Sequence, residues 1–587
     1  MSMQPRPWPQ IPEATVRAAR AAAAKGPYPL AMRIRDELGE LFADAEFAEA
    51  FGVRGKPGWS PGRLALVTVL QMAEDLTDRA AAQRVRFGMD WKYALGMELD
   101  DPGLDASVLC EFRTRVIQHG LEERVLDLLL VALKAKGLVK AGGKQRTDST
   151  HVLAAVRDLN RLELAGESVR ACVEALAVAA PGWLAHTIEM ASWGKRYTAR
   201  VDSWRLPTSQ AKRTELALAY GRDAFALLGA VYSAAAPVWV RELPAVDVLR
   251  VVVPQNYTRT ITSDGREVVT RREADEDGLP PGRCRVTSPY DTDARWGGKR
   301  DTFWNGYKVH VSETCEQPQV GGGADTADAA DDQRGQSAPV GQATEVPNII
   351  TGVATTDATV ADQAMTEPIH RQLARRGLLP AEHYLDSGYP SAELLVGSLA
   401  TFGIALITPV LLDTSAQARA GAGFDRTAFH IDWDAQQVTC PQGRRSASWS
   451  PCTQRGTEAI VVKFPAEACQ TCPARDQCTT AGRGGRQLTL RPRDVQQALD
   501  AARAQQDTKS WQTKYALRAG VEGTIGQAVA VTDVRHARYR GRKKVHLEHV
   551  LSAVALNLIR LDHWWNGHPM DRTRTSHLAR LELALAA

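Results

Sequence analysis

Three acidic residues of the chain are of a type and placement that could bind divalent metal ions together. Asp148 lies in the middle of the predicted strand 142–152. Asp386 follows the predicted strand 382–385, and Glu522 lies in a late helical segment. Neighbouring parallel strands end at the same edge of a sheet, and a helix packed over that edge can supply a third carboxylate. Carboxylate oxygens suit Mg²⁺, and two such ions can activate a nucleophile and stabilise the leaving oxygen in phosphodiester cleavage. The alternative is that each is an ordinary surface acid, because the chain contains 68 Asp and Glu residues.

The residues around Glu522 add a second chemical group. Tyr515, Arg518 and Glu522 follow one another at i, i+3 and i+7, so they share one helical face. An arginine on that face could hold a phosphate beside the carboxylate. The alternative is a structural ion pair between Arg518 and Glu522 at i, i+4.

Two further acids compete with Asp386 for the second position. Asp357 precedes the predicted helix 359–376, and Asp362 lies in its first turn. Carboxylates are stabilised at a helix amino terminus by the helix dipole. We therefore interpret both as structural residues.

A basic segment after Glu522 is the clearest local concentration of charge. It contains no acid before Glu548, and it consists of Arg535, Arg538, Tyr539, Arg540, Arg542, Lys543 and Lys544, with His536 interleaved. Such a run is typical of a phosphate-backbone contact, and Tyr539 could stack on a splayed base. The alternative is solvated surface charge. Arg79, Arg84 and Arg86 could likewise belong to a helix-turn-helix-like DNA reader, although helical domains of this size are common.

Five of the nine cysteines lie between residues 440 and 478. Cys469, Cys472 and Cys478, together with either Cys440 or Cys452, could form a tetrahedral thiolate site for a structural zinc ion. The alternative is a set of free thiols, because the segment contains a single Cys-x2-Cys pair.

Hydrophobic periodicity predicts the elements that must position these residues. Residues 28–138 read as helical, with Ser60 and Thr77 as helix caps. The segment 157–241 also reads as helical, and 247–253 and 258–270 read as extended. Strands and helices then alternate over 305–313, 348–355, 359–376, 382–389, 392–402 and 404–410. This alternation predicts an α/β sheet with parallel strands. A long polar helix over 494–531 and an apolar helix over 547–565 complete the chain.

Composition narrows the class of protein. The net charge of +4 arises from 72 basic and 68 acidic side chains, so any surface that binds a polyanion must be a local feature. The longest charge-free run of the helical middle, residues 224–240, is too short to span a membrane and contains a proline.

Residues 316–347 contain six acids and no aromatic residue, which predicts a disordered loop. Sparse cysteines and the absence of a signal-peptide pattern predict a cytoplasmic protein.

Several short motifs of the chain resemble those of bacterial insertion-sequence transposases of the DDE type, in the subgroup with a Tyr-Arg-Glu signature. The motifs occur in the order found in that family and span nearly the whole chain. They are Thr147-Asp148-Ser149-Thr150, Gly306-Tyr307-Lys308-Val309-His310, the segment 384–389, the Tyr515, Arg518 and Glu522 series, the segment 538–541 and the segment 557–560. One position departs from the family pattern, because Val529 stands where the signature often has a lysine.

The resemblance implies an RNase H-like catalytic core in which Asp148, Asp386 and Glu522 bind two Mg²⁺ or Mn²⁺ ions. It also implies an enzyme that binds terminal inverted repeats, cleaves DNA at the ends of an element and joins them to target DNA, as a homodimer in the synaptic complex. The alternatives are a transposase-derived DNA-binding protein that no longer cleaves, and an RNase H-like nuclease. The expected organisation is a helical DNA-binding domain (1–140), the core (141–160 and 286–425), a mainly helical insertion (161–285), a cysteine-rich insertion (426–490) and the carboxyl-terminal helices with the basic segment (491–587).

Overall fold

The fold was analysed in a computed structural model, which describes residues 2–273, 275, 278–299, 301–315 and 346–567. The amino-terminal region is helical, as predicted. Its helices are α1 (Glu13–Ala23), α2 (Leu30–Leu38), α3 (Pro61–Ala73), α4 (Asp78–Phe87), α5 (Met89–Leu95), α6 (Ala106–Gln118) and α7 (Arg124–Ala135). Two predicted caps are confirmed: the Ser60 hydroxyl accepts from the backbone of Arg63, and the Thr77 hydroxyl accepts from the backbone of Ala80.

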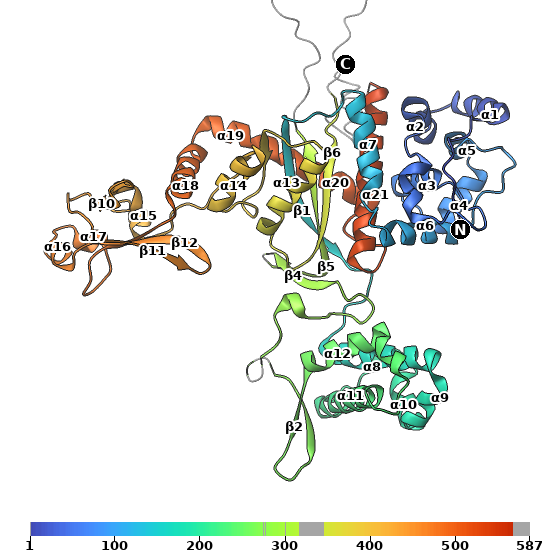
Figure 1. Ribbon diagram of the computed structural model, residues 1–587, viewed down its shortest axis with the longest axis horizontal. Helices are drawn as coiled ribbons and strands as arrows, with labels where there is room; N and C mark the ends of the chain where they lie inside the picture. Colours follow the sequence, from blue (N-terminus) through green and yellow to red (C-terminus); the bar gives the residue numbers. More distant parts are fainter. Residues whose placement is uncertain (1, 274, 276–277, 300, 316–345, 568–587) are drawn as a thin grey trace, which may run out of the picture.

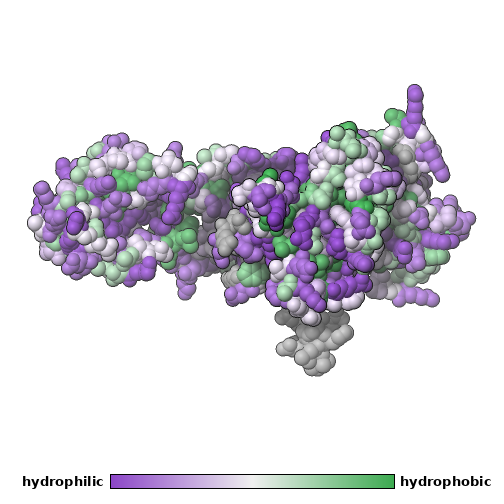
Figure 2. Space-filling model, turned by 90° about the horizontal axis from the view of Figure 1, so that it is seen from below, coloured by the Kyte–Doolittle hydropathy of each residue, from purple (hydrophilic) through white to green (hydrophobic). Residues whose placement is uncertain are grey.

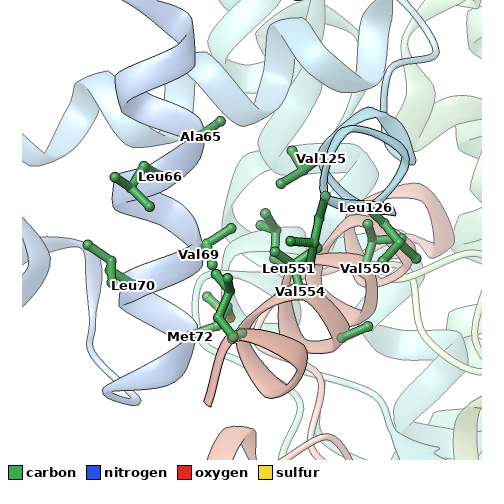
Figure 3. Packing of buried hydrophobic residues seen from close by; sticks show 14 of the residues in the cluster. Ala65, Leu66, Val69, Leu70, Met72, Val125, Leu126, Val550, Leu551 and Val554 are labelled. Atoms are coloured by element: carbon green, nitrogen blue, oxygen red, sulfur yellow. The ribbon is translucent and has the colours of Figure 1, made fainter. Parts of the chain in front are cut away.

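The amino-terminal helices share one hydrophobic core with the last helix, α21 (Arg542–Trp565). Figure 3 shows α3, α7 and α21 meeting through aliphatic side chains, among them Val69, Val125 and Leu551. The other face of α21 packs against the central sheet, where Asn557 hydrogen-bonds both backbone groups of Ile350. α21 therefore joins the amino-terminal helices to the sheet (Figure 1).

The central sheet has six strands and mixed direction. They are β4 (Arg295–Lys299), β5 (Thr302–Thr314), β1 (Lys144–Leu153), β7 (Glu382–Tyr384) and β8 (Ala405–Ile407) in spatial order, with β6 (Ile350–Asp357) pairing with β5. β7 and β8 run parallel to β1, as the alternating pattern predicted. β5 is antiparallel to β1, β4 and β6, so the sheet is mixed rather than parallel throughout.

The strand register gives the two faces of the sheet different roles. Val309 and Val311 on β5 point into the core shared with α21. Lys308 and His310 alternate with them and point to the opposite face. There Lys308 contacts Asp362, and His310 contacts Tyr389. That face also carries α13 (Thr366–Arg375) and α14 (Ala392–Phe402).

The mainly helical insertion has a core of its own. It contains α8 (Arg161–Ala179), α9 (Pro181–Thr187), α10 (Met190–Tyr197), α11 (Gln210–Val231), α12 (Pro244–Asn256), β2 (Tyr257–Ile261) and β3 (Glu267–Arg271). The hairpin predicted within 258–270 is present. The extended segment predicted at 247–253 is wrong, because these residues lie inside α12. Its valines favoured a strand, but Val246, Leu249 and Val253 are buried at helical spacing.

The cysteine-rich insertion extends away from the sheet on one side (Figures 1 and 2). It follows the short helix α15 (Ala416–Ala420) and contains β9 (His430–Asp432), β10 (Gln437–Thr439), β11 (Ser448–Gln454), β12 (Thr457–Lys463), α16 (Ala466–Gln470), α17 (Arg475–Cys478) and β13 (Gln487–Leu490). A small cluster that includes Phe429, Val462 and Leu490 forms its core.

The long helix predicted over 494–531 is wrong, because the structure divides it. It consists of α18 (Arg493–Gln506), α19 (Lys509–Tyr515), a 3-10 turn (Ala516–Ala519) and α20 (Gly520–Thr532). Asp507 ends α18, and the Thr508 hydroxyl caps α19 by accepting from the backbone of Trp511. Thr508 therefore begins a separate helix, α19, after the end of α18.

Other predicted elements differ in length. The predicted strand 382–389 ends at Tyr384, and the predicted helix 359–376 begins as a 3-10 turn at Asp362 before α13. Of the loop predicted over 316–347, residues 316–345 lie outside the described residues. Within the described part of the chain, no helix is both long and apolar enough to cross a membrane.

Candidate active site

One guanidinium group lies among the three predicted acids. Arg518 Nη2 is 2.5 Å from Asp148 Oδ2 and 4.0 Å from Asp386 Oδ2. Arg518 Nη1 pairs with the carboxylate of Glu522. The structure thus brings together three acids, of which the first and last, Asp148 and Glu522, are 374 positions apart in the sequence.

The sheet register explains why the two aspartates meet. Arg146 on β1 lies opposite Tyr384 on β7, and the strands are parallel, so Asp386 comes level with Asp148. Asp386 lies in the turn that follows β7, where its Oδ1 accepts from the backbone N–H of Gly388 at 2.9 Å. Asp148 Oδ1 accepts from the backbone N–H of Ser149 at 2.8 Å. These backbone bonds fix one oxygen of each carboxylate and leave the other facing Arg518.

Glu522 reaches the site from α20, and a buried ion network holds this helix in place. Arg146 Nη1 donates to the carbonyl of Leu517 at 2.7 Å, and the Arg146 guanidinium also pairs with Glu313 on β5. The other oxygen of Glu313 pairs with Arg560 of α21 at 2.8 Å and accepts from Thr524 of α20. Glu313 is fully buried. The network therefore ties β1, β5, α20 and α21 together directly behind the acids.

Gly520 is required where α20 begins. A Cβ placed on Gly520 would lie 2.0 Å from Arg146 Nη1. Arg146 cannot easily move away, because Glu313 and the carbonyl of Leu517 hold it. The absence of a side chain at 520 lets the helix approach β1 closely enough for Arg518 and Glu522 to reach the aspartates.

The electrostatics of the site are set by burial and by the ion pairs. Burial raises the pKa of Asp148, although Arg518 and the Ser149 backbone N–H oppose that rise. Burial opposes the charge of Arg518, but the nearby acids, Asp148 first, raise its pKa above the ordinary value. Arg518 is thus a fixed positive charge among the three acids.

Asp362, which the sequence offered as a competitor of Asp386 and which we interpreted as structural, also lies beside the site. Its Oδ2 accepts from Ser149 Oγ and its Oδ1 from Lys308 Nζ, both at 3.1 Å. A Cβ placed on Gly388 would lie 3.1 Å from Asp386 Oδ1 and 3.4 Å from Asp362 Oδ2, so both carboxylates flank that glycine. The strand position of Lys308 predicts its face of the sheet but not its pairing with Asp362. Asp357 has a local structural role instead, because its Oδ1 accepts from the backbone and hydroxyl of Thr359.

The aromatic and histidine residues of the motifs support the sheet beneath the acids. Tyr389 is fully buried, and its hydroxyl lies 2.7 Å from His310 Nδ1. Burial lowers the pKa of His310 to about 4, so this ring is neutral at physiological pH. Tyr515 donates to the carbonyl of Leu385 at 3.2 Å, and its ring stacks on Trp511. Tyr515 therefore connects α19 to the turn that carries Asp386.

The donor set fits a divalent cation. Asp148 and Asp386 both face the same nitrogen of Arg518, so two carboxylates already converge on one cationic position. Their hard oxygens are the ligands that Mg²⁺ and Mn²⁺ prefer. As placed, no three His, Cys, Asp or Glu side chains among the described residues form a group that could hold a metal ion. The guanidinium fills the position between the acids.

The predicted basic segment divides into half-buried and exposed parts. Arg535 donates to Thr150 Oγ1 at 3.0 Å, and Arg538 donates to the carbonyl of Leu76 at 3.0 Å and pairs with Asp75. The ring of Tyr539 is covered by the guanidinium of Arg113, 4.9 Å from the ring centre. These three predicted DNA contacts are engaged within the protein. The exposed remainder consists of Arg540, Arg542, Lys543 and Lys544, here called the basic patch.

The arginines of α4 also differ in whether they are paired within the protein or exposed to solvent. Arg84 pairs with Glu74 and Asp90, which holds it against its own domain. Arg79 and Arg86 are exposed.

The predicted cysteine ligands fall into two groups. Cys440, Cys469, Cys472 and Cys478 line one pocket of the cysteine-rich insertion. Cys452 lies on β11, opposite Ala459 of β12, and does not line that pocket.

Two segments of the chain match known protein families. Residues 439–562 match the transposase DDE domain, a segment that includes Arg518, Glu522 and the basic patch. Residues 30–115 match the transposase domain DUF772, which covers the helices from α2 to most of α6. No curated protein and no solved structure matches the chain. The chain therefore carries two segments similar to transposase domains, one of them the DDE domain that defines a class of transposase enzymes.

Proposed function

We propose that this protein is a DDE transposase that binds the terminal inverted repeats of an insertion sequence, cleaves DNA at its ends and transfers them to target DNA. The observation that carries the proposal is the convergence of Asp148, Asp386 and Glu522 around Arg518. The match of residues 439–562 to the transposase DDE domain supports it. An RNase H-like core is our interpretation of the central sheet, whose β1 and β7 bring the two aspartates level.

Asp148, Asp386 and Glu522 would hold Mg²⁺ or Mn²⁺ in this proposal. When bound, a pair of such ions supplies activation of a water or 3′-hydroxyl nucleophile and neutralises charge on the leaving oxygen. Hydrolysis and strand transfer are the same displacement with different nucleophiles, so one set of carboxylates serves both.

Arg518 has a role of its own in the proposed cycle. Before DNA arrives, its guanidinium offsets part of the negative charge of the three acids and keeps the site assembled. A DNA phosphate is a bidentate acceptor that competes well for an arginine. When Arg518 turns to the phosphate, Asp148 and Asp386 lose their counter-ion and become free for a divalent cation. DNA binding and metal binding are then coupled, and each strengthens the other.

The surfaces that hold DNA are proposed to lie outside the acidic site. The basic patch would contact phosphates, and the helices within residues 30–115 would contribute further contacts. Two copies of the chain, each with one element end, would form the synaptic complex. We retain the division of the chain into an amino-terminal DNA-binding domain, a split core and two insertions as part of this proposal.

A second candidate is a transposase-derived DNA-binding protein that does not cleave. Val529 stands at the position of the signature lysine and packs against the hydrophobic core. It therefore cannot make the DNA contact expected of that lysine. This candidate predicts binding to the element ends without strand cleavage.

Cleavage of the DNA that flanks the gene tests the proposal. The probes are duplexes from each side of the open reading frame and a scrambled duplex of equal length, incubated with the full-length protein and Mn²⁺. We expect a retarded complex and a strand break with the flanking duplexes, and neither with the scrambled one. Retardation without a break under Mg²⁺ and Mn²⁺ would favour the second candidate.

A further inference from the structure

We propose that Cys440, Cys469, Cys472 and Cys478 bind one structural zinc ion within the cysteine-rich insertion. The four residues line a single cavity of about 20 Å³. A cavity of that size holds one small ion or water and excludes an organic ligand. This inference is independent of the proposed transposase activity.

The fold explains how distant cysteines converge. Cys440 follows β10, where the chain turns back toward Arg445. Cys469 lies in α16, Cys472 lies between the two short helices, and Cys478 ends α17. A loop after a strand thus faces a pair of short helices across the cavity, an arrangement in which two chain segments can share a tetrahedral ion.

The structure also decides between the two candidates for the fourth ligand. Cys452 belongs to β11 and is paired with Ala459 in the middle of a β hairpin. It does not line the cavity, whereas Cys440 does. The ligand set is therefore Cys440, Cys469, Cys472 and Cys478, and Cys452 serves as a matched control.

The surroundings of the sulfur atoms suit thiolates. The backbone N–H of Arg444 donates to Cys440 Sγ at 3.3 Å, and the backbone N–H of Arg486 donates to Cys469 Sγ at 3.4 Å. Such bonds stabilise negative charge on sulfur. Arg444, Arg475 and Arg486 are among the residues that line the same cavity. Four thiolates around Zn²⁺ carry a net charge of −2, which these arginines can offset.

The insertion gains stability from an ion because its own core is small. That core comprises six buried residues, with Cys440, Cys469 and Cys478 packed at its edge. All four cavity cysteines are half-buried free thiols. Among the described residues, no three of these cysteines form, as placed, a group that could hold a metal ion. Zinc binding would draw the thiol groups together, and its free energy would stabilise the insertion.

Zinc analysis of the purified full-length protein tests this site. We expect one zinc per chain by elemental analysis, and thiolate-to-cobalt charge-transfer absorption after exchange with Co²⁺. Cys469→Ser and Cys478→Ser should each lower the zinc content at least tenfold relative to the wild type. Cys452→Ser should keep one zinc per chain.

A measurement on the wild type avoids dependence on folding of the variants. Titration with a mercurial that blocks thiols, in the presence of a zinc indicator, should release one zinc as the four cavity thiols react. Wild-type protein without zinc after growth in zinc-supplemented medium, or with disulfides among the four cysteines, would overturn the proposal. Loss of zinc in Cys452→Ser equal to that in Cys469→Ser would also overturn the ligand set.

Discussion

Arg518 Nη2 lies 2.5 Å from Asp148 Oδ2, and the same guanidinium also faces Asp386 and Glu522. The positive charge that assembles the acidic site is therefore part of the protein itself. It occupies the place that we propose for a divalent cation. Removal of Arg518 should consequently have opposite effects on the metal-free protein and on metal binding.

We predict that Arg518→Gln weakens the metal-free fold and strengthens metal binding. Asp148 is nearly buried, so loss of its partner should lower the free energy of unfolding by about 1–3 kcal/mol. Without the competing guanidinium, Mn²⁺ should bind roughly tenfold more tightly, which is about 1.4 kcal/mol. Chemical denaturation and calorimetric titration with Mn²⁺, both without DNA, measure the two effects.

Arg371→Gln is the matched control for this substitution. Arg371 forms an i, i+4 pair with Glu367 on the exposed side of α13. Its replacement should change stability by less than about 0.5 kcal/mol and leave Mn²⁺ affinity unchanged. Equal Mn²⁺ affinity in Arg518→Gln and the wild type would show that the guanidinium does not compete with the ion.

Gly520 offers a test of how α20 is positioned. Gly520→Ala should lower stability by about 1–3 kcal/mol, because the added Cβ meets Arg146 and overpacks a buried contact. Gly523→Ala on the same helix meets open space and should be neutral or stabilising by up to about 1 kcal/mol. Thermal unfolding of both variants makes the comparison. Equal stability of the two variants would indicate that Arg146 moves freely.

The basic patch is predicted to contribute affinity for DNA without sequence discrimination, because phosphate contacts carry no base information. Replacement of Arg540, Arg542 and Lys544 by alanine should weaken binding to flanking and scrambled duplexes alike. The slope of log affinity against log salt should become less steep by roughly 0.9 per lost phosphate contact. Alanine at the exposed Arg205, Lys212 and Arg266 of the helical insertion is the control. An unchanged slope in the patch variant would show that the patch faces solvent in the complex.

Glu548 makes stability depend on pH. Burial raises its pKa to about 7, although the backbone N–H of Arg538 donates to its carboxylate. A carboxyl group with a raised folded-state pKa stabilises the fold below its unfolded pKa, and that contribution is lost as the pH rises toward 7. Glu548→Gln removes this dependence. The melting temperature of the variant minus that of the wild type should therefore be more favourable at pH 8 than at pH 5, and a constant difference would contradict the raised pKa.

Much of the fold could be predicted from local pattern. Ser60 and Thr77 cap helices where expected, because capping depends on residues adjacent in sequence. The strand through Asp148 and the helix Ala392–Phe402 were also correctly placed. Where several signals compete locally, the prediction failed. The valines at 246–253 favour a strand, but their burial at helical spacing places them in α12.

The contacts within the site could be predicted only in part. The spacing of Arg518 and Glu522 offered an i, i+4 ion pair as the alternative to a phosphate contact, and the structure contains that pair. The pairing of Arg518 with Asp148, and of Lys308 with Asp362, depends on tertiary approach between distant elements. Its place in the first turn of a predicted helix led us to interpret Asp362 as a structural acid. The same tertiary packing encloses Arg538 and Tyr539, which the sequence presents as members of a continuous basic run.

Strand cleavage by Asp386→Asn, compared with its binding to the same flanking duplex, tests the central claim most directly. The substitution keeps the shape of the side chain but removes a carboxylate charge that faces Arg518. We predict that the variant still retards the duplex while its cleavage with Mn²⁺ falls roughly 10²-fold or more. Asp357→Asn, which alters a local cap of Thr359, should cleave like the wild type. Normal cleavage by Asp386→Asn together with loss of cleavage by Asp357→Asn would contradict the assignment of the catalytic acids.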